Sequence, residues 1–408
     1  MSPIDFDILS IIGLIILLAY LGSKSLQLLG APQVVGYILV GVLLGSSFLN
    51  VVPMQLVSEL SVISEIALGL IGFEMGSRLR LDELRRMGRM ILFILLGEAF
   101  GTFLLVAGGV YWLTGSDYTA LIFGALAAAT APAATVDVLA EYKAKGPLTT
   151  SLLAVVGLDD ALALLLFSIT SAIAEALLAH TGGVSIVQMI ILPFQEIGGA
   201  LLIGAGIGLP FQWMLDRLKK REHAVCGYIV GTVLLVAGLA NSIGASLILT
   251  TMTLGVLMAN VRTDNSEFAH CAVERVGPLA YILFFVLVGA RVQISLLPQM
   301  GLLGILYILL RSMGKFGGAW IGGWLGGAET KVRDNLGFGL LSQAGVAIGL
   351  ALSIAGRFDA YGEAGVRLGQ TVLNVITATT FVVQIVGPIM VKLAVERSGE
   401  AGKATGEA

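Results

Sequence analysis

The chain has few charged residues and few residues that bind metals. Only 12% of its 408 residues are charged, whereas charged residues make up roughly a quarter of an average soluble domain. Its two cysteines, Cys226 and Cys271, lie far apart and without a CxxC spacing, so the sequence predicts neither a disulfide nor a metal site. These shortages exclude an ordinary soluble domain. No cofactor and no nucleic-acid partner are expected.

Apolar residues are abundant instead. They make up 57% of the chain and form long runs, and about 20 of them suffice to cross a hydrocarbon core of about 30 Å. The first residues are acidic and include no basic region, so the run at 8–28 is a retained first span and not a cleaved signal peptide. The chain divides into thirteen segments with short connections: 6–28, 33–49, 55–76, 89–113, 118–142, 147–179, 184–215, 222–239, 242–261, 276–296, 300–326, 334–355 and 369–393.

This pattern predicts an all-α polytopic membrane protein with about thirteen transmembrane helices. Residues 1–395 form a single transmembrane unit. The remaining residues, 396–408, are small and polar, a composition that predicts a short disordered tail.

The distribution of basic residues supports the count of thirteen independently. Basic residues favour cytoplasmic loops, and nineteen of the twenty-four lysines and arginines lie in the connections after odd-numbered segments or in the tail. An even number of spans would have scrambled this asymmetry. The amino terminus is therefore expected outside and the carboxyl terminus in the cytoplasm.

Two adjacent carboxylates, Asp159 and Asp160, lie about halfway along the sixth segment. An ionised carboxylate at this depth costs on the order of 3 kcal/mol, which indicates a functional role. Lys315, in the eleventh segment, is expected at the same depth. Because successive helical residues point about 100° apart, only one aspartate can face Lys315, and the other is free for a transported ion.

Two further segments are interrupted at that depth. The fifth contains Thr130-Ala131-Pro132, followed by Thr135, and the twelfth contains Ser342-Gln343-Ala-Gly345. Irregular backbone at mid-membrane is tolerated where it is buried in protein or lines a wet cavity, and the helix ends there can hold ions. An intact segment, a broken segment and a long segment follow one another at segments 4–6, and the same order recurs at segments 11–13. The two copies are seven segments apart. Because seven is odd, they must cross the membrane in opposite directions, which predicts an inverted-topology repeat.

Together, the motifs Thr130-Ala-Pro-Ala-Ala-Thr135, Gly157-Leu-Asp-Asp160, Phe284-Phe-Val-Leu-Val-Gly289, Gly314-Lys315 and Gln343-Ala-Gly345 carry a family resemblance. The chain resembles the cation/proton antiporter superfamily, specifically its second family of bacterial sodium/proton and potassium/proton exchangers. The resemblance implies a multi-pass protein of the plasma (inner) membrane that is not an enzyme and that handles Na⁺, or another monovalent cation, and protons.

The resemblance also implies roles for residues and segments. Asp160 would be the essential ion- and proton-binding carboxylate, Asp159 the partner of Lys315, and the two broken segments would cross beside them. The family is usually a homodimer. Helices within 1–76 and 222–296 would form the dimerisation part, and helices within 89–215 and 300–395 the core ion-transport part.

The transported cation and the stoichiometry remain open at this point. The pair of aspartates favours electrogenic exchange of Na⁺ or Li⁺ for two protons, and K⁺/H⁺ or electroneutral exchange is the alternative. Arg311 lies four residues before Lys315 and so on the same helix face. If it reached the site it would weaken the attraction for a cation. The alternative is that Arg311 has a structural role and forms an ion pair with Glu98, or with Glu65 or Glu196.

Functions of other classes fit less well. An intramembrane aspartyl protease needs its two carboxylates on different helices, and here they are neighbours on one. A channel would present repeated carbonyl filters or rings of charge, which the sequence lacks. A sodium-coupled organic-anion symporter of the bile-acid type shares a related fold and stays an alternative.

Overall fold

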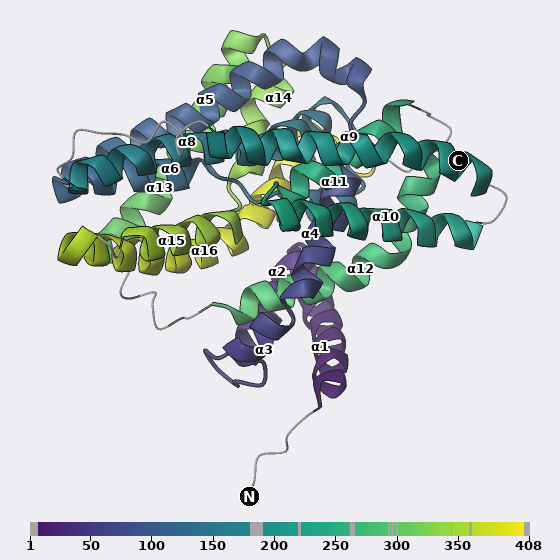
Figure 1. Ribbon diagram of the computed structural model, residues 1–408, viewed down its shortest axis with the longest axis horizontal. Coiled ribbons are helices and arrows are strands. Elements are labelled where there is room, and N and C mark those ends of the chain that lie inside the picture. Colours follow the sequence, from purple (N-terminus) through teal and green to yellow (C-terminus); the bar gives the residue numbers. More distant parts are fainter. Residues whose placement is uncertain are drawn as a thin grey trace, which may run out of the picture.

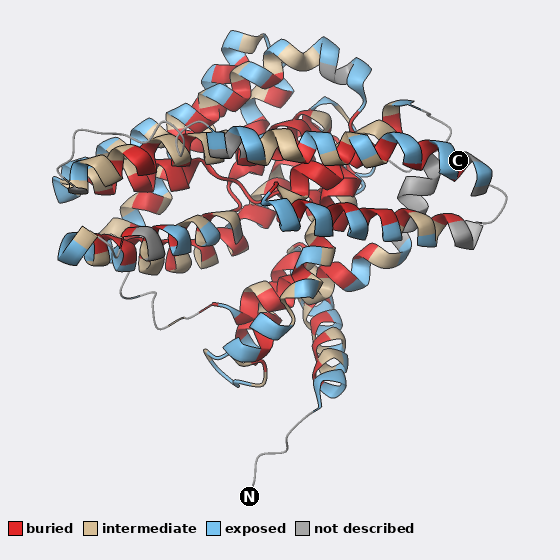
Figure 2. Cartoon of the chain, viewed as in Figure 1, coloured by how far each residue is buried: buried red, intermediate tan, exposed pale blue. Residues whose placement is uncertain are grey.

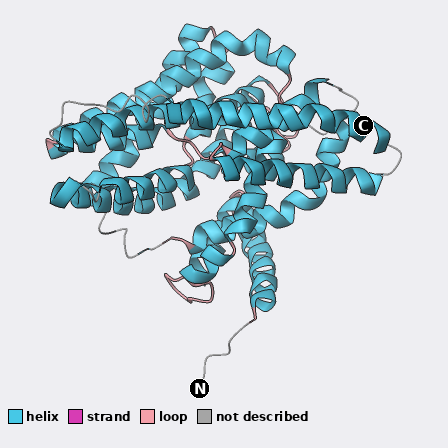
Figure 3. Ribbon diagram, in the orientation of Figure 1, coloured by secondary structure: helices cyan, strands magenta, loops and turns pink. Residues whose placement is uncertain are grey.

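The computed structural model describes residues 7–179, 191–218, 222–261, 266–292, 294, 298, 301–343, 345–358 and 361–403 (Figure 1). These residues are almost entirely helical, and among them there is no strand, only an isolated bridge between Gly45 and Val52 (Figure 3). The expected all-α membrane fold is confirmed. The helices are α1 (Ile8–Leu28), α2 (Gln33–Leu44), α3 (Met54–Glu59), α4 (Ser61–Arg78), α5 (Leu81–Thr114), α6 (Asp117–Ala128), α7 (Pro132–Glu141), α8 (Pro147–Ala179), α9 (Leu192–Leu218), α10 (Glu222–Ile243), α11 (Leu247–Val261), α12 (Ser266–Ala290), α13 (Gly301–Gly326), α14 (Thr330–Asn335), the 3-10 helix η5 (Leu336–Leu340), α15 (Gly345–Phe358) and α16 (Gly362–Ser398).

Each of the thirteen expected segments overlaps one, two or three of these helices. Among the described residues, eight helical stretches are long and apolar enough to cross a membrane, and four shorter helices are also apolar. The third segment is α3 followed by α4, the fifth is α6 followed by α7, and the twelfth is divided among α14, η5 and α15. Residues 184–190 of the seventh segment and residues 293, 295 and 296 of the tenth lie outside the described residues.

The helices pack as two groups. In the first group, α4 packs on α11 and α12, and α2 packs on α1 and α12. In the second, α5 packs on α13 and α6, α8 packs on α6, and α15 packs on α16. A separate cluster of buried side chains, including Phe123, Phe167 and Tyr307, belongs to the second group alone. Buried residues gather toward the centre of the molecule (Figure 2), and α6 and α7 are buried over most of their length.

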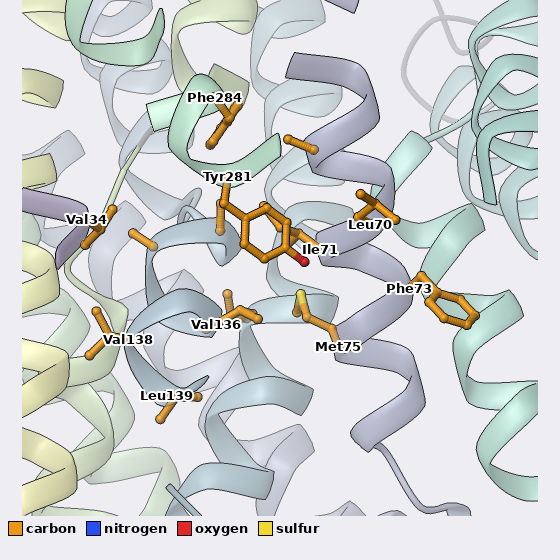
Figure 4. Packing of buried hydrophobic residues seen from close by; sticks show 14 of the residues in the cluster. Val34, Leu70, Ile71, Phe73, Met75, Val136, Val138, Leu139, Tyr281 and Phe284 are labelled. Atoms are coloured by element: carbon orange, nitrogen blue, oxygen red, sulfur yellow. The ribbon is translucent and has the colours of Figure 1, made fainter. Parts of the chain in front are cut away.

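The two groups meet along α7. Figure 4 shows Ile71 and Met75 of α4, Val136 of α7 and Tyr281 of α12 in one apolar contact. At the end of α7 the carboxylate of Glu141 accepts two hydrogen bonds from the first group. The Gln27 side chain donates to Oε1 at 2.9 Å, and the Gln33 backbone N–H donates to Oε2 at 2.8 Å. This contact joins the two groups at the end of α7.

The second group contains the predicted repetition. The long helix α5 is followed by the interrupted pair α6 and α7 and then by the long α8. The long helix α13 is followed by the interrupted stretch η5 and α15 and then by the long α16. Small residues let α5 and α13 approach closely, because a Cβ on Gly101 would lie only 3.2 Å from the Cα of Gly318.

The expectation of a disordered tail from residue 396 is wrong for the part that is described. Helix α16 continues to Ser398, and Gly399 ends it in the left-handed conformation at φ 71°. Glu400 is then almost completely buried. Its carboxylate accepts hydrogen bonds from the backbone of Leu148 and of Thr149, each at 2.8 Å, and from the Thr149 hydroxyl at 2.7 Å. Residues 404–408 lie outside the described residues.

Glu400 thereby caps the first turn of α8. The first N–H groups of a helix have no partner within it, and a carboxylate there also interacts favourably with the helix dipole. The turn before α8 leaves room for it only because residue 146 is glycine. A Cβ on Gly146 would lie 2.6 Å from Oε1 of Glu400.

We expect Glu400→Ala to lower the free energy of unfolding by roughly 2–4 kcal/mol, because it leaves three buried donors without an acceptor. Thermal unfolding of the purified protein in detergent measures the loss. Glu396→Gln is the matched control, since Glu396 is half exposed and pairs only with Lys392 on the helix surface. Equal unfolding temperatures for the two variants would contradict a capping role.

Candidate functional site

The two interrupted stretches contact each other at the centre of the second group. Helix α6 ends at Ala128 and α7 begins at Pro132, while η5 ends at Leu340 and α15 begins at Gly345. The backbone N–H of Ala131 donates to the carbonyl of Ser342 at 2.9 Å. Proline has no N–H and disfavours a helical residue before it, and Ala131 is indeed extended, with φ −88° and ψ 110°. The break in α6–α7 thus follows from Pro132.

Arg311 of α13 holds both breaks. Its side chain is fully buried. Nε donates to the carbonyl of Ala127 at 3.1 Å, Nη1 donates to that of Leu341 at 2.6 Å, and Nη2 donates to those of Ala129 and Ser342 at 2.8 and 3.3 Å. These carbonyls lie at the ends of α6 and η5, where the helices leave acceptors without a partner and carry partial negative charge. One guanidinium therefore satisfies both helix ends.

The expected ion pair between Arg311 and Glu98 is wrong. Glu98 of α5 pairs with Lys315 instead, at 2.5 Å between Oε2 and Nζ. Arg311 and Lys315 lie one turn apart on the same face of α13, so both point toward the buried centre. The guanidinium, with its forked donors, matches the carbonyls of the two breaks, and the ammonium occupies the position between the carboxylates.

Lys315 lies between two carboxylates from different helices. Besides Glu98, it contacts Oδ2 of Asp159 at 3.2 Å, and it also donates to the carbonyl of Ala128 at the end of α6. All three charged side chains are fully buried. The structure brings Lys315 and Asp159 together as the sequence indicated. It adds Glu98, a residue for which the sequence suggested a different partner.

Asp160 points in a different direction from Asp159. It lines a narrow cavity, without room for a water molecule, that is also bounded by Ile197 of α9 and by Ser246 and Leu249 near the start of α11. Its carboxylate is buried, and its Oδ1 has no hydrogen-bond partner among the described residues. One aspartate of the pair is thus engaged by a cation, and the other faces a cavity.

The break between α6 and α7 contacts the break between η5 and α15, and this contact is called the crossing. Near the crossing, several buried oxygens have no hydrogen-bond partner in the described part of the chain. Such atoms are rare in folded proteins and call for an explanation such as a bound ion or a catalytic role. Three carboxylates (Glu98, Asp159, Asp160) lie near two cations (Arg311, Lys315), which leaves a formal excess of one negative charge. The buried oxygens without a partner are Oε1 of Glu98, Oγ1 of Thr130, Oδ1 of Asp159, Oδ1 of Asp160 and Oγ of Ser342.

The remaining predicted residues support the crossing. The Gln343 amide donates to the carbonyl of Leu126 at 2.7 Å and contacts the Tyr307 hydroxyl. Thr135 donates to the carbonyl of Gly339 at 3.1 Å. It therefore ties α7 to η5 and does not bond back to its own helix. The sequence did not predict a role for Tyr307, which contacts Gln343, because its neighbours in the sequence are all apolar.

A larger cavity of about 380 Å³ reaches the crossing from the interface between the two helix groups. Thr130 and Pro132 form its inner end, and Glu65 and Arg291 lie toward its mouth among apolar side chains. The cavity therefore reaches the crossing from this side, and at the far end of α7 Glu141 joins the two groups through its hydrogen bonds with Gln27 and Gln33. The cavity is lined by Ser61, Ser64, Glu65, Leu68, Ala129, Thr130, Ala131, Pro132, Ala133, Ile248, Phe284, Val288, Arg291, Val346 and Ala347.

Comparisons with known proteins agree with this architecture. The family described as sodium/hydrogen exchanger, transmembrane, matches residues 13–397. The chain is 28% identical to the Na⁺/H⁺ antiporter of Enterococcus hirae over 362 residues, which cover 84% of this chain and 88% of the relative. It is 25% identical to the Na⁺/H⁺-K⁺ antiporter GerN of Bacillus cereus over 418 residues, which cover 98% and 100%. The sodium proton antiporter MjNhaP1 from Methanocaldococcus jannaschii has a similar fold, with a TM-score of 0.73 at 19% identity over 97% of each chain.

We expect Arg311→Lys to destabilise the protein by roughly 3 kcal/mol or more, because a single ammonium cannot reach the carbonyls of both breaks at once. Thermal unfolding in detergent measures this. Arg80→Lys is the matched control, since Arg80 is exposed and should unfold like the native protein. An Arg311→Lys variant that unfolds at the native temperature would show that the breaks do not depend on the guanidinium.

Proposed function

The chain belongs to the transmembrane sodium/hydrogen exchanger family, and from that premise we propose that it exchanges Na⁺ or Li⁺ for protons by competition at Asp160. We also propose that the protein lies in the plasma (inner) membrane with its amino terminus outside. Membership of this family leaves the organic-anion symporter and the protease without support.

The observation that carries the proposal is the position of Asp160. It is a buried carboxylate beside a cavity, with one oxygen that lacks a partner, and it adjoins a carboxylate that is already engaged by Lys315. A carboxylate can hold a proton or a partly dehydrated cation but not both. Protons and cations then exclude each other, and alternating exposure of the site couples their movements.

The charge count supports transfer of the loaded site through the membrane. With the three carboxylates and two cations ionised, the cluster carries one excess negative charge. As long as Lys315 stays charged, either one proton or one monovalent cation at Asp160 cancels it. Both loaded forms are then neutral and can pass the hydrophobic barrier at lower cost than the unloaded form.

Electrogenic exchange of two protons for one cation requires a second proton carrier, and we propose the Lys315–Asp159 pair for it. Lysine shifts its pKa readily on burial and can give up a proton during a cycle. The alternative is one-for-one exchange, of Na⁺ or of K⁺. It is favoured by Glu98, because this second carboxylate at 2.5 Å can hold Lys315 charged throughout the cycle.

We further propose that the moving unit comprises helices within 89–215 and 300–395, and that helices within 1–76 and 222–296 form the static part of a homodimer. The separate buried cluster of the second group and its shared fixation by Arg311 support movement of α5, α6, α8, α13, α15 and α16 as one body. Helix α9, which the proposed range also includes, packs mainly on α11 and α10. Such a movement would have to break the hydrogen bonds that Glu141 accepts from Gln27 and Gln33.

We expect Asp160→Asn to abolish cation-dependent proton movement, because the amide keeps the size of the side chain but cannot titrate or neutralise a cation. Proteoliposomes loaded with a pH-sensitive dye measure exchange after addition of Na⁺, Li⁺ or K⁺. Asp334→Asn, the same change at an exposed position, is the control and should exchange normally. Near-normal exchange by folded, purified Asp160→Asn would exclude Asp160 as the carrier.

We expect Lys315→Gln to reduce the charge moved per turnover from one toward zero, because the second proton carrier is removed. Solid-supported-membrane currents and dye-monitored turnover, recorded on the same preparation, give the ratio. Full-size currents with unchanged voltage dependence would leave Lys315 a structural residue. If the native protein itself reaches an ion gradient that is indifferent to a clamped voltage, exchange is one-for-one and Glu98 has the role described above.

A further inference from the structure

A second large cavity lies away from the crossing, between the start of α5, the start of α8 and the end of α13. It has a volume of about 780 Å³, within the range of about 300–1,000 Å³ that small ligands occupy. Arg89, at its wall, precedes Glu98 by nine residues on α5, or about 13 Å at about 1.5 Å per residue. The cavity is therefore separate from the proposed ion site. It is lined by Arg86, Met87, Arg89, Met90, Lys145, Gly146, Pro147, Thr150, Gly326, Gly327, Glu329 and Val332.

Positive charge predominates in this cavity. Arg86, Arg89 and Lys145 line it together with a single carboxylate, that of Glu329. The carboxylate of Glu400 lies close behind Gly146, but its oxygens are occupied by the first turn of α8. Among the described residues no carboxylate forms an ion pair with Arg86 or Arg89. Two guanidinium groups are thus available for an anion.

The cavity has rigid walls. A Cβ on Gly326 would lie 2.7 Å from the Cα of Met90, so α5 and α13 touch through their backbones at this level. On the opposite side the turn before α8 is fixed by the burial of Glu400. The basic groups are therefore presented by a preformed concave surface and not by a flexible loop.

The exposed surface beside the cavity is aromatic and apolar. Trp320, Trp324 and Leu325, near the end of α13, are about half exposed or more. Tryptophan is enriched where a membrane protein meets the lipid headgroups, which places the cavity at headgroup level on the side rich in basic residues. Basic pockets between transmembrane helices at that level suit phosphate headgroups.

We propose that this cavity binds the phosphate of an anionic ligand, and that the headgroup of an anionic phospholipid supplies it. Arg86 and Arg89 donate to the phosphate oxygens in the forked geometry that a guanidinium offers. Lys145 adds charge from the turn before α8, and the acyl chains lie along the surface of Trp324 and Leu325. The bound lipid would join the ends of α5, α8 and α13.

The experiment uses the full chain, purified in detergent and stripped of lipid. Cardiolipin and phosphatidylglycerol are titrated against phosphatidylcholine, and binding is followed by native mass spectrometry and by the unfolding temperature. The test variant is Arg86→Gln with Arg89→Gln. The control variant, Arg80→Gln with Arg85→Gln, loses the same charge from the same end of α5 but outside the cavity.

We expect anionic lipid to bind the native protein and the control variant with similar affinity, and the test variant at least about tenfold more weakly. Retained cation/proton exchange by the test variant in proteoliposomes shows that it is folded. Equal binding of anionic lipid by the test and control variants would overturn the proposal. Tight binding of ATP or pyrophosphate that depends on Arg86 and Arg89, without preferential lipid binding, would overturn the lipid as the source of the phosphate.

Discussion

The architecture depends on one buried guanidinium that satisfies the ends of two broken helices. A helix can be interrupted within a membrane only if its free carbonyls find donors, and Arg311 provides donors for four of them. The close contact of α13 with α5 brings this side chain to the centre. The same contact brings Lys315, one turn further along, between Glu98 and Asp159. The scaffold and the charged cluster are therefore set by consecutive turns of one helix.

Arg311 binds the carbonyls of the two breaks and Lys315 binds carboxylates, so the two adjacent aspartates have different surroundings. Asp159 is held by Lys315, whereas Asp160 faces the cavity beside α9 and α11. Adjacent residues on a helix point about 100° apart, so one side chain can belong to the structural network while its neighbour stays available. The paired charges keep the site polar and buried, and the excess of one carboxylate makes it attractive to a monovalent cation or a proton.

Much of this could be predicted from the sequence, because each feature rests on local chemistry. The lengths of the apolar runs predicted the helices, and Pro132 predicted one of the two breaks. The depth of Lys315 in its segment predicted that it lies beside Asp159. The partner of Arg311 could not be predicted. Residues four apart share a helix face, so spacing alone does not decide which cation meets Glu98, and the carbonyls that Arg311 binds leave no mark in the sequence. The burial of Glu400 was also missed, since its partners lie about 250 residues earlier and its own segment is small and polar.

The position of Glu400 has a consequence for the order of assembly. Helix α8 emerges from the ribosome long before residue 400, and until then its first turn lacks the acceptor that the finished protein provides. The first turn of the helix that carries the aspartate pair is thus capped only after the chain has grown by about 250 further residues. A nascent chain halted before this point would already contain the buried charged cluster, but the first turn of α8 would still lack its acceptor.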